Sequence, residues 1–253
     1  MSKTRGGVSL PPFFTLSAFE TIDSTNIHAR KLGDEGALEG QLIWSLRQEQ
    51  GVGRRGRDWS SPEGNLYCSV LLRPGCSASE GAKLSFLVAA AMRRAIAPHL
   101  PAPDGLSLKW PNDLLINQKK LVGILLESKS NAEGILDWLV IGTGVNVASF
   151  PKQTNGLSAT SLRAEGGRMS LETLLEDYAF NLLALYEQWK NEGFEPIRQE
   201  WLAHAHGLQK KITVRLPHEE FSGIFKDIDP SGALVLRQED GTTRLVTAGE
   251  VFF

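Results

Sequence analysis

DLLINQKKLVGILLE, residues 113–127, contains two aliphatic runs that are separated by only three residues. Both runs, DLLI and KLVGILLE, have the composition of buried β-strands. The connection of Asn117, Gln118 and Lys119 is too short to cross over a sheet, so the two strands must be antiparallel neighbours. The stretch therefore predicts a β-hairpin within a mixed or largely antiparallel sheet.

Further strand-like runs flank this hairpin on both sides, and they predict a sheet of six or seven strands. The runs are FFTLSAFETI (13–22), QLIWSLRQ (41–48), NLYCSVLLR (65–73), LSLKW (106–110) and DWLVIGTGVNV (137–147).

Three helices are predicted beside the sheet. One begins at Ser77, where Glu80 three residues later completes a capping-box pattern, and it runs to residue 97 with one apolar face. A second begins at Ser170 and ends at Gly193, with leucines and aromatics at helical spacing. A short third helix follows Ser24.

The character of the chain changes at about residue 208. KKITVRL, FSGIFKDID, ALVLRQ and TRLVTAGEV are short strands separated by turns rich in proline and glycine. They predict a small β-barrel. We therefore expect an α+β protein with one domain over residues 1–207 and a second over residues 208–253.

Composition excludes several classes of protein. With 42% hydrophobic and 22% charged residues, the chain is that of an ordinary globular protein and not a disordered one. Its net charge of −2 provides no overall positive field for nucleic acid or an anionic membrane. No signal-peptide pattern and no long apolar run occur, and Cys68 and Cys76 lack the spacing of a zinc site. We expect a cytoplasmic protein with two reduced thiols.

GVGRRGRDW, residues 51–59, is the most distinctive segment for chemistry. It matches the GxGxxG pattern, but a dinucleotide site needs a helix directly after the glycines, and the polar, turn-rich stretch DWSSPEGN follows instead. We interpret the segment as a flexible loop that brings Arg54, Arg55 and Arg57 together toward an anion. The alternative interpretation is a solvent-exposed basic turn.

Four more segments carry polar residues at places where a site can form. They are DSTN (23–26), KWPND (109–113), KKLVGILLES (119–128) and GTGVNV (142–147). Pro111 must end its strand or place it at an edge, and Lys120 begins the return strand of the hairpin, so Lys120 is expected near residues 109–113. Gly123 predicts a close approach by a flat group or another backbone. The histidines lie outside all of these segments, and neither cysteine has a basic neighbour, so no nucleophilic triad is predicted.

In combination and in this order, these segments resemble those of the biotin protein ligases in their catalytic-core form, over nearly the whole chain. The C-terminal FSGIFKDIDPSGAL adds to the resemblance. It implies the class II aminoacyl-tRNA-synthetase-like, or biotin-lipoate ligase, fold: a mixed sheet with helices on one side and a small SH3-like barrel behind it.

The resemblance also implies the site residues. Those implied for biotin are Ser24, Thr25, Asn26, Gln48, Val52, Gly53, Arg54, Lys120 and Gly123. Those implied for ATP and the adenylate are Arg57, Trp59, Asn112, Asp113 and Asn146, with Arg54, Lys120 and Asp113 as catalytic residues and Asp113 as the ligand of Mg²⁺. One position departs from the family pattern: Val52 stands where an arginine is usual.

The implied activity is ATP-dependent formation of biotinyl-5′-AMP, followed by transfer of biotin to a lysine of a biotin carboxyl carrier protein. Because about 20 residues precede DSTN, too few for a helix-turn-helix, we expect no DNA binding and no repressor activity. A homodimer stays open. Two alternatives also stay open: a ligase for lipoate or another short acid, against which the Gln48 amide favours the ureido group of biotin, and a non-enzymatic binding protein that uses the basic loop and the barrel.

Overall fold

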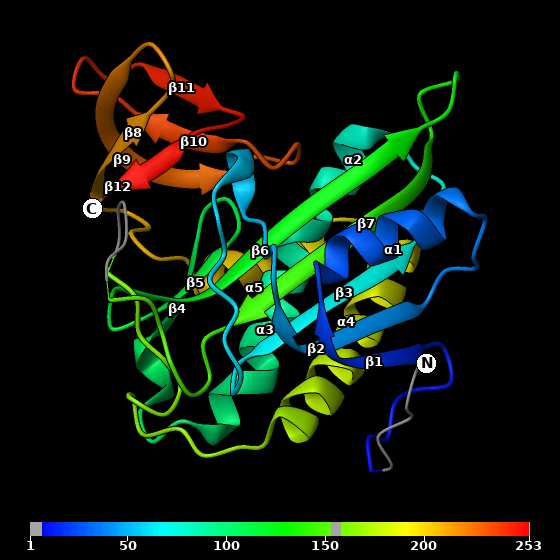
Figure 1. Cartoon of the computed structure of the whole chain (residues 1–253). Coiled ribbons are helices and arrows are strands. Elements are labelled where there is room, and N and C mark those ends of the chain that lie inside the picture. Colours follow the sequence, from blue (N-terminus) through cyan, green and yellow to red (C-terminus); the bar gives the residue numbers. More distant parts are fainter. Residues whose placement is uncertain (1–6, 153–157, 253) are drawn as a thin grey trace.

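The computed structural model describes residues 7–152 and 158–252, which form two β-sheets with helices packed on the larger one (Figure 1). The larger sheet has seven strands in the order β1-β2-β3-β7-β6-β5-β4. Each predicted run in the first part of the chain is one of its strands. Their bounds are β1 (Thr15–Ile22), β2 (Gln41–Gln48), β3 (Leu66–Leu72), β4 (Leu106–Lys109), β5 (Asp113–Ile116), β6 (Lys119–Ser130) and β7 (Leu136–Val145).

The predicted hairpin is present at one end of this sheet. β5 pairs with β6 in antiparallel orientation, and Asp113 lies opposite Gly123. β1 and β2 are parallel and are joined by α1 (Thr25–Asp34), whereas the other strand pairs of this sheet are antiparallel. The prediction of a mixed, largely antiparallel sheet is confirmed.

Helices pack on both faces of the sheet. Alternate side chains of a strand point to opposite sides, and here both sets include apolar residues that helices cover. Leu42, Trp44 and Val70 belong to the main core with α3 (Leu84–Ile96), α4 (Leu171–Glu192) and α5 (Glu195–Ala203). Ile43 and Leu71 face the other way and pack with Ala29 of α1 in a second core. The expectation of helices on one side only is therefore wrong for α1.

The helix predicted from Ser77 is interrupted. It forms α2 (Ala78–Ala82), with Ser77 accepting a hydrogen bond from the Glu80 amide as predicted, and then α3. At the junction the Lys83 amide donates to the carbonyl of Glu80, three residues back, and this tighter turn breaks the α-helical pattern. Short 3-10 turns follow α3 at Ala97–His99 and Pro103–Gly105.

The helix predicted after Ser24 is α1, although Ser24 makes no side-chain capping bond, and the helix predicted from Ser170 is confirmed at both ends. Ser170 caps α4 by accepting from the Thr173 amide, and Gly193, with φ of +78°, ends it. α5 was not predicted, although Pro196 in its first turn is a usual signal of a helix start.

The second sheet has five strands in the order β11-β10-β9-β8-β12, and it agrees with an SH3-like barrel. Its strands are β8 (Lys211–Arg215), β9 (Glu220–Ile228), β10 (Leu234–Arg237), β11 (Thr243–Val246) and β12 (Glu250–Phe252). TRLVTAGEV, which we expected to be one strand, contributes to two, because the chain turns at residues 247–249. The domain boundary between residues 207 and 208 stays a prediction.

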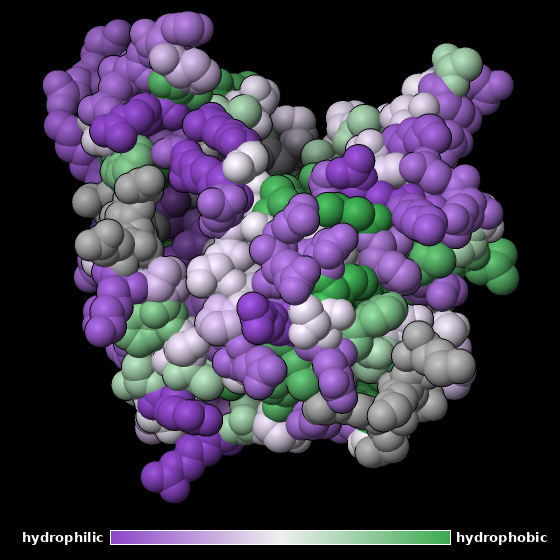
Figure 2. All heavy atoms as spheres, in the orientation of Figure 1, coloured by the Kyte–Doolittle hydropathy of each residue, from purple (hydrophilic) through white to green (hydrophobic). Residues whose placement is uncertain are grey.

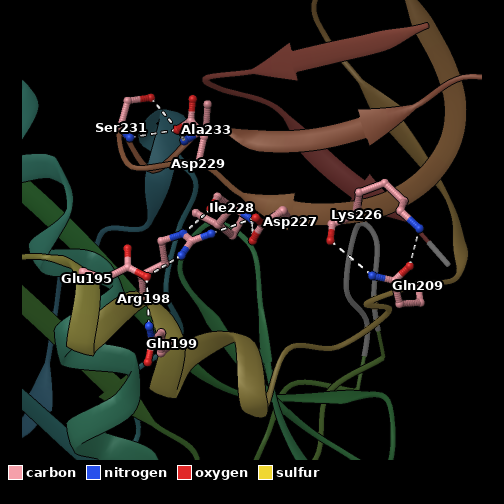
Figure 3. A network of polar contacts seen from close by, with 10 residues as sticks. All are labelled: Glu195, Arg198, Gln199, Gln209, Lys226, Asp227, Ile228, Asp229, Ser231 and Ala233. Atoms are coloured by element: carbon pink, nitrogen blue, oxygen red, sulfur yellow. Dashed lines mark hydrogen bonds and ion pairs between the residues drawn. The ribbon is translucent and has the colours of Figure 1, made fainter.

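Arg198 of α5 fastens the barrel to the helical face of the large sheet (Figure 3). Its guanidinium donates to the backbone carbonyl of Ile228 and, at 2.7 Å, to the carboxylate of Asp227, both on β9. A third contact, at 2.7 Å, holds the same guanidinium to Glu195 within α5. Trp110 adds a second connection by donating to the carbonyl of Gly232 at 3.2 Å.

We expect Arg198→Met to lower the free energy of unfolding by about 2 kcal/mol, because a guanidinium with three protein partners is removed and the Ile228 carbonyl is left without it. Chemical denaturation measures this change. Arg94→Met is the matched control, because Arg94 makes an exposed ion pair with Glu200 of the same helix, and it should change stability by less than about 1 kcal/mol. Equal effects of the two substitutions would contradict the anchoring role of Arg198.

Among the described residues, no helix combines the length and the hydrophobicity that a bilayer crossing requires.

Candidate active site

A cavity of about 910 Å³ opens between the large sheet and the barrel. It is bounded by the start of α1, the loop after β2, the strands β5, β6 and β7, and strand β12 of the barrel. In Figure 2 the surface is hollowed between the barrel and the far end of the β6–β7 hairpin. The volume is typical of a site for a small molecule or a nucleotide.

The structure brings all of the predicted site residues to this one cavity. They come from segments far apart in the chain, and the ligand contacts that we expect of each stay predictions. The residues are Ser24, Thr25, Asn26, Gln48, Val52, Gly53, Arg54, Arg57, Trp59, Asn112, Asp113, Lys120, Gly123 and Asn146.

A fixed set of polar groups forms the end of the cavity at α1. The Gln48 carbonyl oxygen accepts from the Thr25 backbone amide at 2.8 Å and from the Thr25 hydroxyl at 3.1 Å. The Gln48 amide in turn donates to the Ser61 hydroxyl at 3.0 Å. These bonds fix the orientation of the Gln48 side chain and leave one of its N–H donors for a ligand.

The side chain of Asn26 makes hydrogen bonds to other protein groups that the sequence did not predict. Its amide donates to Glu127 at 2.8 Å, and its carbonyl oxygen accepts from the Ser69 hydroxyl at 2.6 Å. A Cβ at Gly142 would lie only 2.0 Å from that same oxygen, so glycine is required there for the Asn26 side chain to fit. Asn26 thus has both ends of its amide occupied by protein groups.

The glycine-rich loop is a short hairpin in this structure. Gly53 donates to the carbonyl of Arg57 at 2.7 Å, and Trp59 donates to the carbonyl of Gly51 at 2.8 Å. A 3-10 turn at Arg54–Gly56 forms the tip. Val52 pairs with Asp58 through its backbone while 43% of the residue is exposed, so the backbone of this position builds the loop.

We expected the three loop arginines to come together at one point. Instead they contact two different partners. Arg54 donates to the side-chain oxygen of Asn112 at 2.9 Å, toward the large sheet. Arg57 and Arg55 both pair with Glu250 of β12, the latter at 3.5 Å. The barrel therefore supplies a carboxylate to the loop.

Trp59 returns from the loop into the cavity and covers the two glycines of the central strands. A Cβ built at Gly123 would lie 2.8 Å from the Trp59 ring, and one at Gly144 would lie 2.6 Å from it. Gly123 and Gly144 are opposite each other in the β6–β7 pair. The predicted flat neighbour of Gly123 is thus the indole, whose buried N–H has no hydrogen-bond partner among the described residues.

Two lysines share the carboxylate of Asp113 at the other end of the cavity. Lys120 Nζ lies 2.6 Å from Asp113 Oδ1, and Lys109 Nζ lies 4.0 Å from Asp113 Oδ2. Burial lowers the pKa of Lys109, and the nearby Asp113 opposes this effect. The expected position of Lys120 beside residues 109–113 is confirmed.

Comparison with known proteins identifies the family. The profile of the Biotin/lipoate A/B protein ligase family matches residues 18–146, and the profile of the Biotin protein ligase C terminal domain matches residues 208–253. The biotin--[acetyl-CoA-carboxylase] ligase of Paracoccus denitrificans is 39% identical to this chain, over 91% of this chain and 97% of its own length. This chain belongs to the biotin/lipoate A/B protein ligase family.

Solved structures of family members agree with the fold. The biotin protein ligase of Leishmania major in complex with biotinyl-5-AMP superimposes with a TM-score of 0.65 at 25% identity, over 94% of this chain and 100% of that one. The Aquifex aeolicus biotin protein ligase in complex with biotin and ATP has a TM-score of 0.79 at 24% identity, over 94% of this chain and 97% of that one. The predicted family and fold class are confirmed.

The predicted site lacked two residues that hold Asn26 in place, Ser69 and Glu127, and two that line the cavity, Glu250 and Lys109. Ser69 lies within a run of otherwise core-forming residues, and Glu127 lies near the end of a strand, so neither stands out by spacing. Glu250 is 193 residues from Arg57, and only the folded chain shows their contact. Lys109 was noted in the KWPND segment but was not assigned to the site.

The described side chains of the cavity can hold Mg²⁺ only if phosphate oxygens supply most of the ligands of the ion. Within residues 7–152 and 158–252, no group of three His, Cys, Asp or Glu side chains is placed to hold a metal. Asp113 Oδ1 is buried and pairs with Lys120 without the geometry of a hydrogen bond, so it keeps capacity for another cation. Mg²⁺ is commonly held by one carboxylate together with substrate phosphates, and Asp113 fits that arrangement.

We expect Gly144→Ala to weaken biotin binding about 10-fold or more, because the new methyl group would displace the Trp59 ring from the cavity floor. Calorimetric titration with biotin measures the loss, and tryptophan fluorescence reports the ring. In a Trp59→Ala background the same substitution should cost much less, because the clash has gone. An equal cost in both backgrounds would show that the ring is not responsible.

Proposed function

We propose that this chain is a biotin protein ligase that forms biotinyl-5′-AMP from biotin and ATP with release of pyrophosphate, and then transfers biotin to a lysine of a biotin carboxyl carrier protein. The predicted ligase activity is confirmed by the Paracoccus denitrificans relative, named as a biotin--[acetyl-CoA-carboxylase] ligase, and by the Leishmania major structure with biotinyl-5-AMP.

The order of groups along the cavity is the observation that carries the proposal. Hydrogen-bonding groups of Thr25 and Gln48 stand at one end, the apolar ring of Trp59 lies next, and the ammonium of Lys120 is 5.5 Å from the centre of that ring. Biotin has the same order: a polar ureido ring, an aliphatic chain and a carboxylate. We assign the head to the Thr25 end and the carboxylate to the Lys120 end. This proposal places Trp59, which the family resemblance implies for the adenylate, beside the aliphatic chain of biotin as well.

The first reaction joins two anions. A carboxylate oxygen of biotin attacks the α-phosphorus of ATP, a P–O bond forms, and the P–O bond to pyrophosphate breaks. Lys120 and Arg54 are fixed near the meeting point and stabilise the charge that collects there, by electrostatic attraction that costs no rearrangement. Mg²⁺, when held by Asp113 and the phosphates, supplies further charge neutralisation.

The second reaction needs no nucleophile from the ligase. The ε-amine of the acceptor lysine attacks the acyl carbon, the C–N bond forms, AMP leaves with the electrons of the C–O bond, and the amine loses a proton to solvent. We expect the glycine-rich loop to lie over the acyl phosphate and keep water away while the acceptor approaches.

We also propose where the protein partners of this chain bind. β6 continues past the end of β5, so the edge of residues 125–130 on that side has no strand partner among the described residues. We place the carrier domain at this edge, where an exposed strand can extend the sheet, and a second copy of the chain can use the same edge for a homodimer. We expect no DNA ligand, and a cytoplasmic location, because the reaction consumes ATP and Cys68 and Cys76 are free thiols.

The test is incorporation of biotin into a purified biotin carboxyl carrier domain. With biotin and Mg-ATP, intact mass spectrometry should show one added biotin on the carrier, and none when ATP is omitted or when the acceptor lysine is replaced by arginine. Parallel reactions supply lipoate instead of biotin. Transfer of lipoate but not biotin would sink the proposal in favour of the alternative acid.

A further inference from the structure

Lys109 is a buried cation at the cavity, and neither the family resemblance nor the comparisons assign it a role. It ends β4, directly opposite Asp113 in the β4–β5 pair, and only 7% of the residue is exposed. Its side chain nevertheless lines the cavity. Burying an ammonium group is costly unless an anion lies beside it. Lys109 therefore requires a nearby anion, from the protein or from a ligand.

The protein does not supply enough negative charge at this point. Asp113 is the carboxylate paired with Lys109, and its closer partner is Lys120, at 2.6 Å against 4.0 Å. Among the described residues, no hydrogen bond to the Lys109 ammonium is formed, and Arg54, bonded to the neutral Asn112, adds a third cation nearby. Glu250, the other carboxylate at the loop, already pairs with Arg57 and Arg55.

The position of Lys109 in the cavity indicates which anionic group of the substrates it contacts. Lys120 lies next to the Trp59 ring, whereas Lys109 lies on the far side of Asp113, on the strand farther from β7. If the biotin carboxylate reaches Lys120, then Lys109 is beyond the reacting α-phosphate as seen from biotin. The group of ATP in that direction is the pyrophosphate that leaves.

We propose that Lys109 is a catalytic residue that binds the leaving pyrophosphate of ATP, and this inference rests on the proposed function. When the P–O bond to the α-phosphorus breaks, its electrons go to the pyrophosphate oxygen, and the Lys109 ammonium stabilises that charge. The role belongs to the first reaction alone, because the second reaction involves no pyrophosphate.

The test separates the two reactions with Lys109→Met. Adenylate formation, followed as pyrophosphate release, should fall about 100-fold. Transfer from added biotinyl-5′-AMP to the carrier domain should stay within about 2-fold of the parent, and biotin affinity should not change. Inhibition of adenylate formation by added pyrophosphate should weaken about 10-fold or more.

Thermal unfolding provides a readout that does not depend on activity. Without ligands, the variant should melt no lower than the parent, because a poorly compensated buried charge has been removed. The stabilisation that Mg-pyrophosphate gives the parent should be largely lost. Lys119→Met is the matched control, because Lys119 is next to Lys120 on β6 and is half exposed. This variant should keep the ligand-free melting temperature of the parent and the stabilisation by Mg-pyrophosphate.

Three results would overturn the inference. One is an equal loss in both reactions, which would place Lys109 at the acyl group. Another is a ligand-free melting temperature that falls in both Lys109→Met and Lys109→Gln, which would make the residue structural. The third is unchanged inhibition by pyrophosphate. If instead the parent chain forms no adenylate, the proposed function fails first, so the two failures are distinguishable.

Discussion

Lys120→Ala should reduce adenylate formation by about 100-fold to 1000-fold, because it removes the ammonium closest to the assigned position of the biotin carboxylate. Two anions must meet in the first reaction, and without this cation their repulsion is no longer balanced at the reacting atoms. Unlike the Lys109 substitution, the change should also slow transfer from added biotinyl-5′-AMP, because Lys120 lies on the biotin side of Asp113. Single-turnover measurements of pyrophosphate release and of carrier labelling check both steps.

The control for this substitution lies next to it on the same strand. Lys119→Ala removes an equivalent charge from the same end of β6, but Lys119 Nζ is 3.9 Å from Glu165 and half exposed, so activity should stay near that of the parent. The melting temperature of Lys120→Ala should stay close to that of the parent, because Lys109 remains beside Asp113. Full adenylate formation in Lys120→Ala would refute its role.

Arg54→Gly should release the adenylate about 10-fold to 100-fold faster while leaving the fold intact. The guanidinium connects the loop to Asn112, in the turn between β4 and β5, and Asn112 is itself bonded to the carbonyl of Ile124. Losing a hydrogen bond from a charged group costs about 1.5–3 kcal/mol, which corresponds to that range of rates. Residue 54 is in the loop, so little core packing is lost. Stopped-flow displacement of biotinyl-5′-AMP measures the rate.

Arg55→Gly is the comparison for Arg54→Gly, because it removes the neighbouring guanidinium, which reaches Glu250 and not the large sheet. Arg55 also has a positive φ of +59°, a conformation that glycine adopts without strain. Release of the adenylate should therefore change much less than in Arg54→Gly. Similar release rates in the two variants would show that loop charge in general, and not the bond to Asn112, retains the intermediate.

The sequence was sufficient for the strands of the large sheet, and every residue that it assigned to the site lies at the cavity, although Lys109 and Glu250 were not among them. The short connection between β5 and β6 determines their pairing, and this pairing brings Lys120 to Asp113. α5 was not predicted, because a nine-residue helix has few apolar positions from which to recognise a period. Tertiary contacts such as Arg57 with Glu250 leave no local pattern, since the partners come from separate domains of the chain as we divide it.

The sequence also did not predict how the cavity is arranged in detail. GxGxxG shows that the backbone of the loop is unhindered, but it does not show that Arg54 turns to one partner and Arg57 to another. The close approach at Gly123 was expected, and the identity of its neighbour, Trp59, became clear only from the folded structure. Side-chain direction in loops depends on contacts distant in the chain, so spacing alone does not determine it.

Glu250 joins the barrel to the loop that we expect to bind nucleotide. If a triphosphate attracts Arg57, as the family resemblance implies, it competes with Glu250 for the same guanidinium, so we expect occupancy of the site and attachment of β12 to be thermodynamically linked. Such a linkage is reciprocal: whatever moves β12 away from the loop would alter nucleotide affinity by an equal free energy. The contact of Arg57 with Glu250 would then let the barrel and the nucleotide site influence each other across the two domains.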